Sequence, residues 1–128
     1  MNKKRILIVD DEANTTRPLK ALLEINGEYI VREENNDEKA VETAQEFKPD
    51  LILLDVLMPH LDGARIAARI RSVPDFVHTP IIFVTGIVEK QETYKQENLG
   101  NFPLLVKPAS IEEVREAIKT HLQVDQTI

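Results

Sequence analysis

Short apolar runs recur along the chain and are separated by longer amphipathic stretches. Four runs of 3–5 residues, rich in Ile, Val and Leu, lie at residues 5–9, 51–54, 81–84 and 104–106. Their apolar positions are consecutive and do not alternate with polar ones, which is typical of strands covered on both faces in a parallel sheet. Residues 29–31 form a shorter, more polar run, as expected for a strand at the sheet edge.

Helical periodicity marks the stretches between these runs. Apolar residues at helical spacing predict helices near residues 15–26, 38–47, 63–71, 90–98 and 110–122. Proline is tolerated in a first turn, so Pro18 predicts that the first helix begins near residues 15–16, and Gly27 would stop it. We expect Asn36 or Asp37 to cap the second helix. Residues 110–113 have the spacing of a capping box.

The elements alternate as strand and helix five times. This order predicts an α/β domain with one parallel sheet and right-handed crossovers. We expect the domain to span residues 4–122 and a C-terminal tail to follow at 123–128. The stretch 72–80, which contains two of the seven prolines, is the longest internal loop.

Length and charge narrow the function classes. The 128 residues, 42% of them hydrophobic, fit one domain with a buried core. The absence of Cys excludes a disulfide scaffold, a zinc ribbon and a thiol nucleophile. Lys and Arg number 16 against 22 Asp and Glu, and the net charge of −6 argues against nucleic-acid binding by this domain. The apolar runs are too short for a secretory or membrane-spanning segment, so we expect a cytoplasmic protein without membrane contact.

Polar residues stand at the ends of the predicted strands. Four of the five strands end in such residues, which are Asp10, Asp11, Asp55, Thr85 and Lys107. The carboxyl ends of parallel strands meet at one sheet edge, where the sites of open α/β sheets form. We therefore expect these side chains to lie together.

Three carboxylates in one place repel one another. Two unit charges ~4 Å apart cost about 4 kcal/mol at an effective dielectric of about 20. Such a cluster needs raised pKa values or a cation, and oxygen ligands without His or Cys favour Mg²⁺. Lys107 would then pair with an anion and Thr85 would donate a hydrogen bond. This combination favours phosphoryl transfer with Asp55 as the nucleophile, forming an aspartyl phosphate.

The chain resembles a receiver domain of the two-component response regulator family, over about residues 4–122. The matching residues, in order, are Asp10-Asp11, Asp55 within Leu-Leu-Asp-Val-Leu-Met-Pro, Asp62-Gly63, Thr85 and Lys107-Pro108. A lone Asp-Asp or Lys-Pro pair is a weak signal. The complete set is a specific signal, because the residues occur in the family's order and the acids, the threonine and the lysine stand at strand ends.

The resemblance implies a flavodoxin-like (βα)5 fold, a three-layer sandwich with strand order 2-1-3-4-5. It implies that Asp55 accepts a phosphoryl group from a histidine kinase or a phosphotransfer protein. Mg²⁺ would be held by Asp11, Asp55 and the backbone carbonyl of Leu57, with Asp10 acting largely through water. The chain would catalyse only its own phosphorylation and dephosphorylation and would not be an enzyme with an external substrate.

The resemblance also implies how the signal leaves the site. Thr85 would move toward the phosphoryl group, Lys107 would pair with that group, and the Lys107-Pro108 bond would be cis. The face formed by the fourth helix, fifth strand and fifth helix would rearrange for a downstream protein or a second copy. Residues 14–17 would be candidates for kinase docking. Candidate residues on the output face are Tyr94, Leu99, Phe102, Leu105, Ile111 and Arg115.

Several positions depart from the family pattern. Leu104 stands where the family usually has an aromatic ring that follows the threonine. Gly86 replaces the usual Ala and should leave the phosphoryl site open and its loop more flexible. Leu57 and Ile87 are apolar where polar side chains can help place the hydrolytic water, so we expect a long-lived aspartyl phosphate.

Two other classes of function fit the sequence less well. A binding module that keeps the fold but does not depend on phosphate is favoured mildly by Leu104, and the intact set of site residues argues against it. A small Mg²⁺ phosphatase with an aspartyl nucleophile would need a second acid soon after Asp55, where Val, Leu and Met follow. It would also need a cap over the substrate, and no cap domain is expected. Glu33 and Glu34 are interpreted as part of a solvated face.

Overall fold

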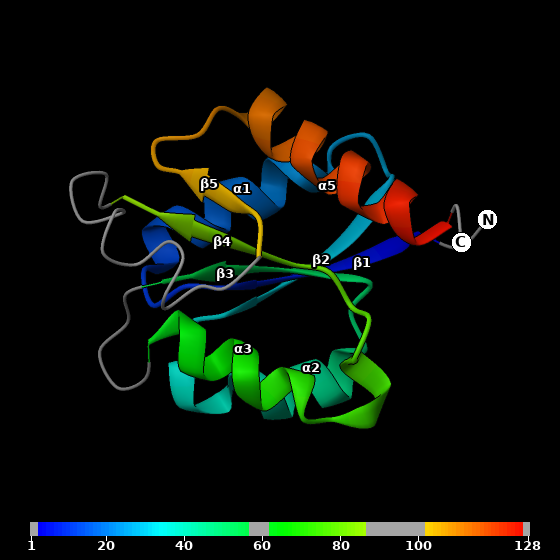
Figure 1. The fold of residues 1–128 in the computed structure, drawn as a ribbon. Helices are drawn as coiled ribbons and strands as arrows, with labels where there is room; N and C mark the ends of the chain where they lie inside the picture. The colour runs from blue at the N-terminus through cyan, green and yellow to red at the C-terminus, as the bar shows by residue number, and fades with distance from the viewer. Residues whose placement is uncertain (1–2, 57–61, 87–101, 127–128) are drawn as a thin grey trace.

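The described part of the chain, residues 3–56, 62–86 and 102–126 of a computed structural model, folds around a five-stranded parallel sheet (Figure 1). The spatial order is β2-β1-β3-β4-β5, and every neighbouring pair is parallel. This order confirms the flavodoxin-like topology expected from the sequence. The strands are β1 (Lys4–Val9), β2 (Tyr29–Glu34), β3 (Leu51–Asp55), β4 (Ile81–Thr85) and β5 (Leu104–Val106).

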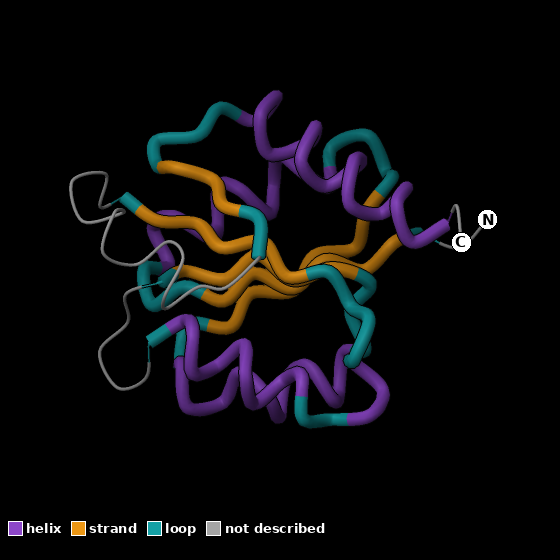
Figure 2. The backbone as a smooth tube through the Cα atoms, in the orientation of Figure 1, coloured by secondary structure: helices purple, strands orange, loops and turns teal. Residues whose placement is uncertain are grey.

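Helices cover both faces of the sheet and make three layers (Figure 2). One face carries α1 (Ala13–Glu24) and α5 (Ile111–Gln126), and the other carries α2 (Ala40–Phe47) and α3 (Gly63–Arg71). The helix expected at residues 90–98 lies outside the described residues. Within the described ranges, no helix combines the length and the apolar composition that crossing a membrane requires.

The core is divided between the two faces of the sheet. In β1, Leu7 and Val9 pack into the cluster under α2 and α3, whereas Ile6 and Ile8 pack into the cluster under α1 and α5. All four are at most 3% exposed. Fully burying one such side chain contributes about 1.5–3 kcal/mol. Because helices cover both faces of the sheet at β1, side chains that point to either face are buried, and the run is apolar at consecutive positions.

The start of α1 differs from the prediction. The helix begins at Ala13, because the carbonyl oxygen of Glu12 already accepts hydrogen bonds from the N–H groups of Thr15 (2.9 Å) and Thr16 (3.2 Å). Pro18 therefore lies inside the helix, beyond its first turn. It can be accommodated there only at the loss of one helical N–H donor. The first residue of α1 is therefore set by the turn that follows β1 and not by Pro18.

The other helix ends follow the expected chemistry. Asn36 caps a 3₁₀ turn, Asp37–Lys39, which leads into α2. Ser110 and Glu113 form the expected capping box, with Ser110 Oγ accepting from Glu113 N at 3.0 Å and Glu113 Oε1 accepting from Ser110 N at 2.8 Å. The helix α5 continues to Gln126, although a tail was expected from residue 123, because no Gly or Pro interrupts it.

Two segments contain more regular structure than the sequence pattern indicates. The strand β2 extends to Glu34, three residues beyond the predicted run, and pairs with β1 along its whole length. The stretch 72–80 includes a 3₁₀ turn, Pro74–Phe76, and Phe76 is buried in the core under α2 and α3. A polar strand at the edge is satisfied by backbone pairing on one side, which hydrophobic pattern alone does not reveal.

Candidate acidic phosphoacceptor site

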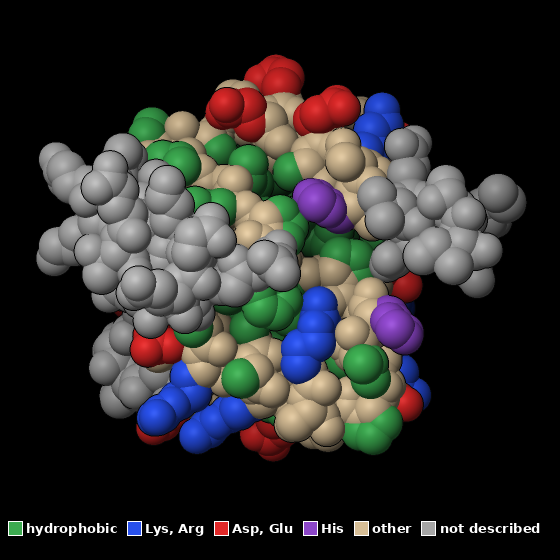
Figure 3. Space-filling model, viewed as in Figure 1, with side chains coloured by type: hydrophobic (Ala, Val, Ile, Leu, Met, Phe, Trp, Pro, Cys, Tyr) green, Lys and Arg blue, Asp and Glu red, His purple; other side chains and the backbone are tan. Residues whose placement is uncertain are grey.

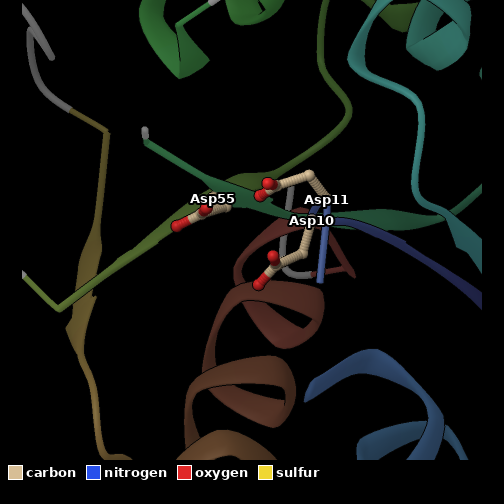
Figure 4. A group of neighbouring side chains, drawn as sticks. All are labelled: Asp10, Asp11 and Asp55. Carbon is tan, nitrogen blue, oxygen red and sulfur yellow. The ribbon is translucent and has the colours of Figure 1, made fainter. Parts of the chain in front are cut away.

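Three carboxylates meet at the carboxyl edge of the sheet, as the sequence predicts (Figure 4). Asp10 and Asp11 follow β1, and Asp55 is the last residue of β3. The two strands are neighbours in the sheet. One carboxylate oxygen from each residue lies within 4.8 Å of the others. The donor set therefore consists of oxygen atoms alone, which suits a hard divalent cation such as Mg²⁺.

The environment of Asp55 disfavours its negative charge. Its exposed fraction is 8%, and that of Asp10 is 4%. Burial raises the pKa of Asp55 to about 6, and the negative charges of Asp10 and Asp11 act in the same direction. The ammonium of Lys107 opposes this shift without cancelling it. At neutral pH the carboxylate is thus mostly ionised, at an energetic cost that a bound cation would relieve.

Lys107 reaches the carboxylates from the end of β5. Its Nζ lies 2.9 Å from Asp10 Oδ2 and 3.6 Å from Asp55 Oδ1. Burial acts to lower the pKa of Lys107, but the hydrogen bond to Asp10 and the two negative charges outweigh it, and the pKa is raised. The side chain therefore remains an ammonium. The Lys107-Pro108 peptide is cis, as expected.

Thr85 is placed beside the acidic cluster by strand pairing. It is the last residue of β4, the strand that neighbours β3, and its exposed fraction is 4%. Its carbonyl oxygen accepts a hydrogen bond from Lys107 N at 2.7 Å, which joins the ends of β4 and β5. The structure thus brings together the side chains of Asp10, Asp11, Asp55 and Lys107, and it places Thr85 at the end of the neighbouring strand. The backbone carbonyl of Leu57, like Ile87, lies outside the described residues.

Asp62 and Gly63 position the start of α3 next to the acidic site. The N–H of Gly63 donates to the carbonyl oxygen of Val56 at 2.7 Å, which brings the start of α3 against the end of β3. A Cβ at position 63 would lie 2.6 Å from the carbonyl oxygen of Asp55, too close for any real contact. Asp62 caps α3 by accepting from Arg65 N at 2.9 Å. The pair therefore packs this helix against the backbone of the phosphoacceptor candidate.

The interpretation of Glu33 and Glu34 as a solvated face is wrong. Both side chains are half-buried. Glu33 Oε1 accepts from the hydroxyl of Thr16 at 2.6 Å. Glu34 accepts from the Thr43 hydroxyl and, through Oε2, from Asn36 N at 2.9 Å. These acids join β2 to the helices on both faces, a role that their sequence context does not indicate because their hydroxyl partners lie on other elements.

The predicted output face is only partly assembled in the described residues. Leu105 and Ile111 pack in the core under α1 and α5, and Arg115 donates to the carbonyl oxygen of Leu22 in α1. Tyr94 and Leu99 lie outside the described residues.

Phe102 and Leu104 pack on the opposite side of the sheet from Leu105. The ring of Phe102 meets that of Phe83 edge to face, with centroids 5.2 Å apart. The guanidinium carbon of Arg71 lies 5.3 Å from the Phe102 ring centroid. Leu104 packs against the same core cluster. Phe102 therefore lies on the opposite side of the sheet from Leu105, at the open edge that β5 forms, and its place on the output face stays a prediction.

Charge and shape distinguish the surfaces near the site. On the face shown in Figure 3, acidic side chains gather over α5 and basic ones over α3, in keeping with the exposed glutamates of the former and exposed arginines of the latter. A mainly apolar groove of about 550 Å³ lies between α1 and α5. One end of the groove reaches the acidic site at Lys107. Its lining residues are Thr15, Leu19, Leu22, Val84, Lys107, Pro108, Ala109, Ile111 and Val114.

Comparison with known protein families gives one match that covers most of the chain. The model described as "Response regulator receiver domain" matches residues 6–119. Among curated relatives, the transcriptional regulatory protein PdtaR of Mycobacterium tuberculosis is 35% identical over 116 residues, which is 91% of this chain and 55% of that protein. The transcriptional regulatory protein ResD of Bacillus subtilis is 36% identical over 122 residues, 95% of this chain and 49% of that protein. The chain thus spans about half the length of these relatives.

Solved structures agree with this match. The response regulator TrrA of Thermotoga maritima, determined in complex with Mg(2+)-BeF, is 30% identical with a TM-score of 0.78, over 92% of this chain and 98% of that one. The chemotaxis protein CheY4 of Vibrio cholerae superposes with a TM-score of 0.82 over 93% of this chain and 98% of its own, at 24% identity. The latter supports the fold alone.

Proposed function

The chain belongs to the response regulator receiver domain family, and from this premise we propose that it is a phosphorylation-dependent signalling switch with Asp55 as the phosphoacceptor. The phosphoryl group would come from a histidine kinase or a phosphotransfer protein. The observation that carries the proposal is the convergence of Asp10, Asp11 and Asp55 with the ammonium of Lys107. This set supplies a nucleophile, a place for a cation and a positive charge for an anion.

The site residues fit Mg²⁺. Asp10, Asp11 and Asp55 offer carboxylate oxygens, and their mutual repulsion favours a cation between them. We propose that Asp11 and Asp55 hold the ion directly and that Asp10 acts largely through water, with the backbone carbonyl of Leu57 as a further ligand. When bound, Mg²⁺ would neutralise the negative charge that phosphoryl transfer brings to the site.

The chain's own residues account for the chemistry of transfer. A carboxylate oxygen of Asp55 attacks the phosphorus of the donor phosphohistidine, the new P–O bond forms, and the P–N bond breaks with its electron pair going to the imidazole nitrogen. Lys107, held as an ammonium, pairs with the transferred group, and Thr85 lies at the adjacent strand end to donate a hydrogen bond to it. Hydrolysis of the aspartyl phosphate returns the chain to its first state. No external substrate is turned over.

The output would be a shift between two populated states. The hydrogen bond from Lys107 N to the carbonyl oxygen of Thr85 joins the ends of β4 and β5, and Val84 and Leu105 of these strands pack against the core cluster that includes α5. Movement of Thr85 would be passed along β5 to α5. The recipient would be a downstream protein or a second copy of the chain, and neither nucleic acid nor a membrane would be contacted by this domain.

The groove between α1 and α5 is the surface at which we place the phosphodonor. It is mainly apolar and leads from Leu22 to Lys107, and Thr15 of the predicted docking segment 14–17 lines it. A donor that inserts apolar side chains there would bring its phosphohistidine to the open end of the acidic site. Because Ile111 of the predicted output face also lines the groove, the two surfaces would meet along α5.

Incubation with a small phosphodonor and Mg²⁺ tests the proposed function. Intact mass spectrometry should detect the gain of one phosphoryl group by the wild-type chain and none by Asp55→Asn. The matched control is Asp62→Asn, which makes the same change at an exposed helix cap where Asn is equally suitable. A gain that survives Asp55→Asn, or no gain in wild type, would leave a phosphorylation-independent binding module as the better account.

A further inference from the structure

A buried hydroxyl in α1 lies between two polar side chains from the region of β2. Thr16 has an exposed fraction of 0%. Its Oγ1 lies 2.6 Å from Glu33 Oε1 and 3.1 Å from Asn35 Nδ2, while the carbonyl oxygen of Ala13 is farther away, at 3.5 Å. A hydroxyl has one proton, and the short contact with a carboxylate is the stronger bond. The proton therefore points to Glu33, which leaves a lone pair to accept from Asn35.

The side-chain amide of Asn35 connects the Thr16 hydroxyl to the backbone of the acidic site. Its amide has two N–H donors, of which one is given to Thr16 and the other to the backbone carbonyl oxygen of Asp10, at 2.7 Å. That carbonyl belongs to the peptide unit that joins Asp10 to Asp11. Because both contacts of Nδ2 are with acceptors, the amide orientation is fixed by its partners.

The Asp11 carboxylate depends on this peptide unit for its position. Asp11 is exposed, and within the described residues no hydrogen bond or ion pair from another side chain holds its carboxylate. Asp10 is anchored from outside this segment, since its Oδ2 pairs with Lys107, and its Oδ1 accepts from Glu12 N at 3.0 Å in a turn that closes over Asp11. Within that turn, rotation of the peptide between the two residues would turn the Asp11 side chain relative to Asp55 while Lys107 keeps its hold on the Asp10 carboxylate.

We propose that Glu33, Thr16 and Asn35 are positioning residues that set the Asp11 carboxylate for Mg²⁺, acting in series through the Asp10 carbonyl. The inference rests on the proposed function, since it concerns the metal that the acidic site would hold. Groups that orient metal ligands from behind typically change metal affinity 10–100-fold when they are removed. The three residues come from α1, from β2 and from the loop after β2, so only the folded chain assembles them.

Two substitutions at position 16 separate positioning from packing. Thr16→Val keeps the shape of the side chain and removes the hydroxyl, whereas Thr16→Ser keeps the hydroxyl and removes the buried methyl group. Calorimetric titration with Mg²⁺ alone should give Thr16→Val an affinity lower by about tenfold and Thr16→Ser an affinity within about twofold of wild type. Thermal unfolding of both variants, measured in parallel, reports packing. If Thr16 had a purely structural role, the Mg²⁺ affinity of the two variants would change in step with their thermal stability and not with the presence of the hydroxyl.

The possible outcomes are distinct. If Thr16→Val binds Mg²⁺ as wild type does, or if Thr16→Ser loses as much affinity as Thr16→Val, the positioning role is overturned while the proposed function stands. A wild-type chain that binds no Mg²⁺ would overturn both. If Thr16→Val does not fold, a substitution of the half-buried Asn35 tests the same role. Asn35→Leu should bind Mg²⁺ about tenfold more weakly than wild type does. Wild-type Mg²⁺ affinity in that variant would overturn the inference.

Discussion

Lys107 forms its closest ion pair with Asp10, 97 positions earlier in the chain, at 2.9 Å from Nζ to Oδ2. The distance from the same nitrogen to Asp55 Oδ1 is 3.6 Å. The two strands that carry Lys107 and Asp10 are not neighbours, because β3 and β4 lie between them. The ammonium thus reaches across the edge of the sheet and offsets the charge of two buried carboxylates at once.

Removal of this ammonium should destabilise the metal-free protein. In Lys107→Met, Asp10 and Asp55 keep their burial and lose their counter-charge, so the free energy of unfolding at pH 7 should fall by about 1–3 kcal/mol. Mg²⁺ should restore part of the loss. Denaturant unfolding with and without Mg²⁺ measures both effects, and Lys119→Met, at an exposed position of α5, is the matched control. Equal effects of the two substitutions would contradict the role given to Lys107.

Asp55→Asn should stabilise the metal-free protein in a pH-dependent way. The pKa of Asp55 is raised from 3.8 to about 6, so between these values the folded state holds a proton that the unfolded state has lost. The contribution of Asp55 to the free energy of unfolding therefore falls as pH rises through this window. Replacement by neutral Asn should remove that loss, on the order of 2–3 kcal/mol by pH 7.

Urea unfolding of both proteins from pH 4 to pH 7.5 in chelator checks this expectation. The stability difference between Asp55→Asn and wild type should be small at the acid end and grow with pH. A constant difference, or wild type being the more stable at pH 7.5, would mean that the carboxylate is not destabilised by its surroundings. Saturating Mg²⁺ should stabilise wild type more than the variant, because the variant lacks one of the ligands.

Gly63→Ala should damage the site through the backbone. The added methyl group would lie 2.6 Å from the carbonyl oxygen of Asp55 and 2.9 Å from Val56 Cα, and neither backbone atom can rotate away. We expect a loss of about 1–3 kcal/mol in stability, together with slower phosphorylation, because the end of β3 must shift.

Gly86→Ala provides the matched control, since it adds the same methyl group near the same site. There the nearest atom is Lys107 Cβ at 3.7 Å, an ordinary contact. Because Ala restricts the unfolded chain more than Gly does, the variant should be unchanged or more stable by about 0.4–1 kcal/mol. If Gly63→Ala were tolerated as well as Gly86→Ala, the close approach of α3 to β3 would not be needed.

The aspartyl phosphate should be long-lived. Leu57 and Ile87, two residues after Asp55 and Thr85, have no polar group with which to place the attacking water. Leu57→Asn should therefore shorten the lifetime, by about tenfold if the amide orients the water. The decay of the phosphoprotein after removal of the donor, followed by intact mass, gives both lifetimes, with Leu57→Met as the apolar control. Rapid decay in wild type would contradict this expectation.

The sheet and the acidic site could be predicted because one signal determines both. An apolar run without alternation indicates a parallel strand, and the residue after it is placed at the carboxyl edge whatever the loops do. Asp10 and Asp55 were found in this way, and so were Thr85 and Lys107.

The remaining features depend on contacts between elements. Thr16 lies in a polar segment, Asn-Thr-Thr-Arg, which gives no sign that one hydroxyl is fully buried against a glutamate 17 positions later. Phe102 flanks β5, which has only three residues, too few to indicate in advance which side of the sheet a flanking residue takes. It shares its side with Leu104, as residues two apart do in an extended chain.

Chemical trapping can show whether Asp55 itself carries the phosphoryl group. After treatment with a small phosphodonor, borohydride reduces an aspartyl phosphate to homoserine, and peptide sequencing by mass spectrometry locates the reduced residue. We expect homoserine at position 55 with Mg²⁺ present, and little or none when Mg²⁺ is chelated. Homoserine at another acid, or none at position 55 under conditions that phosphorylate the chain, would contradict it.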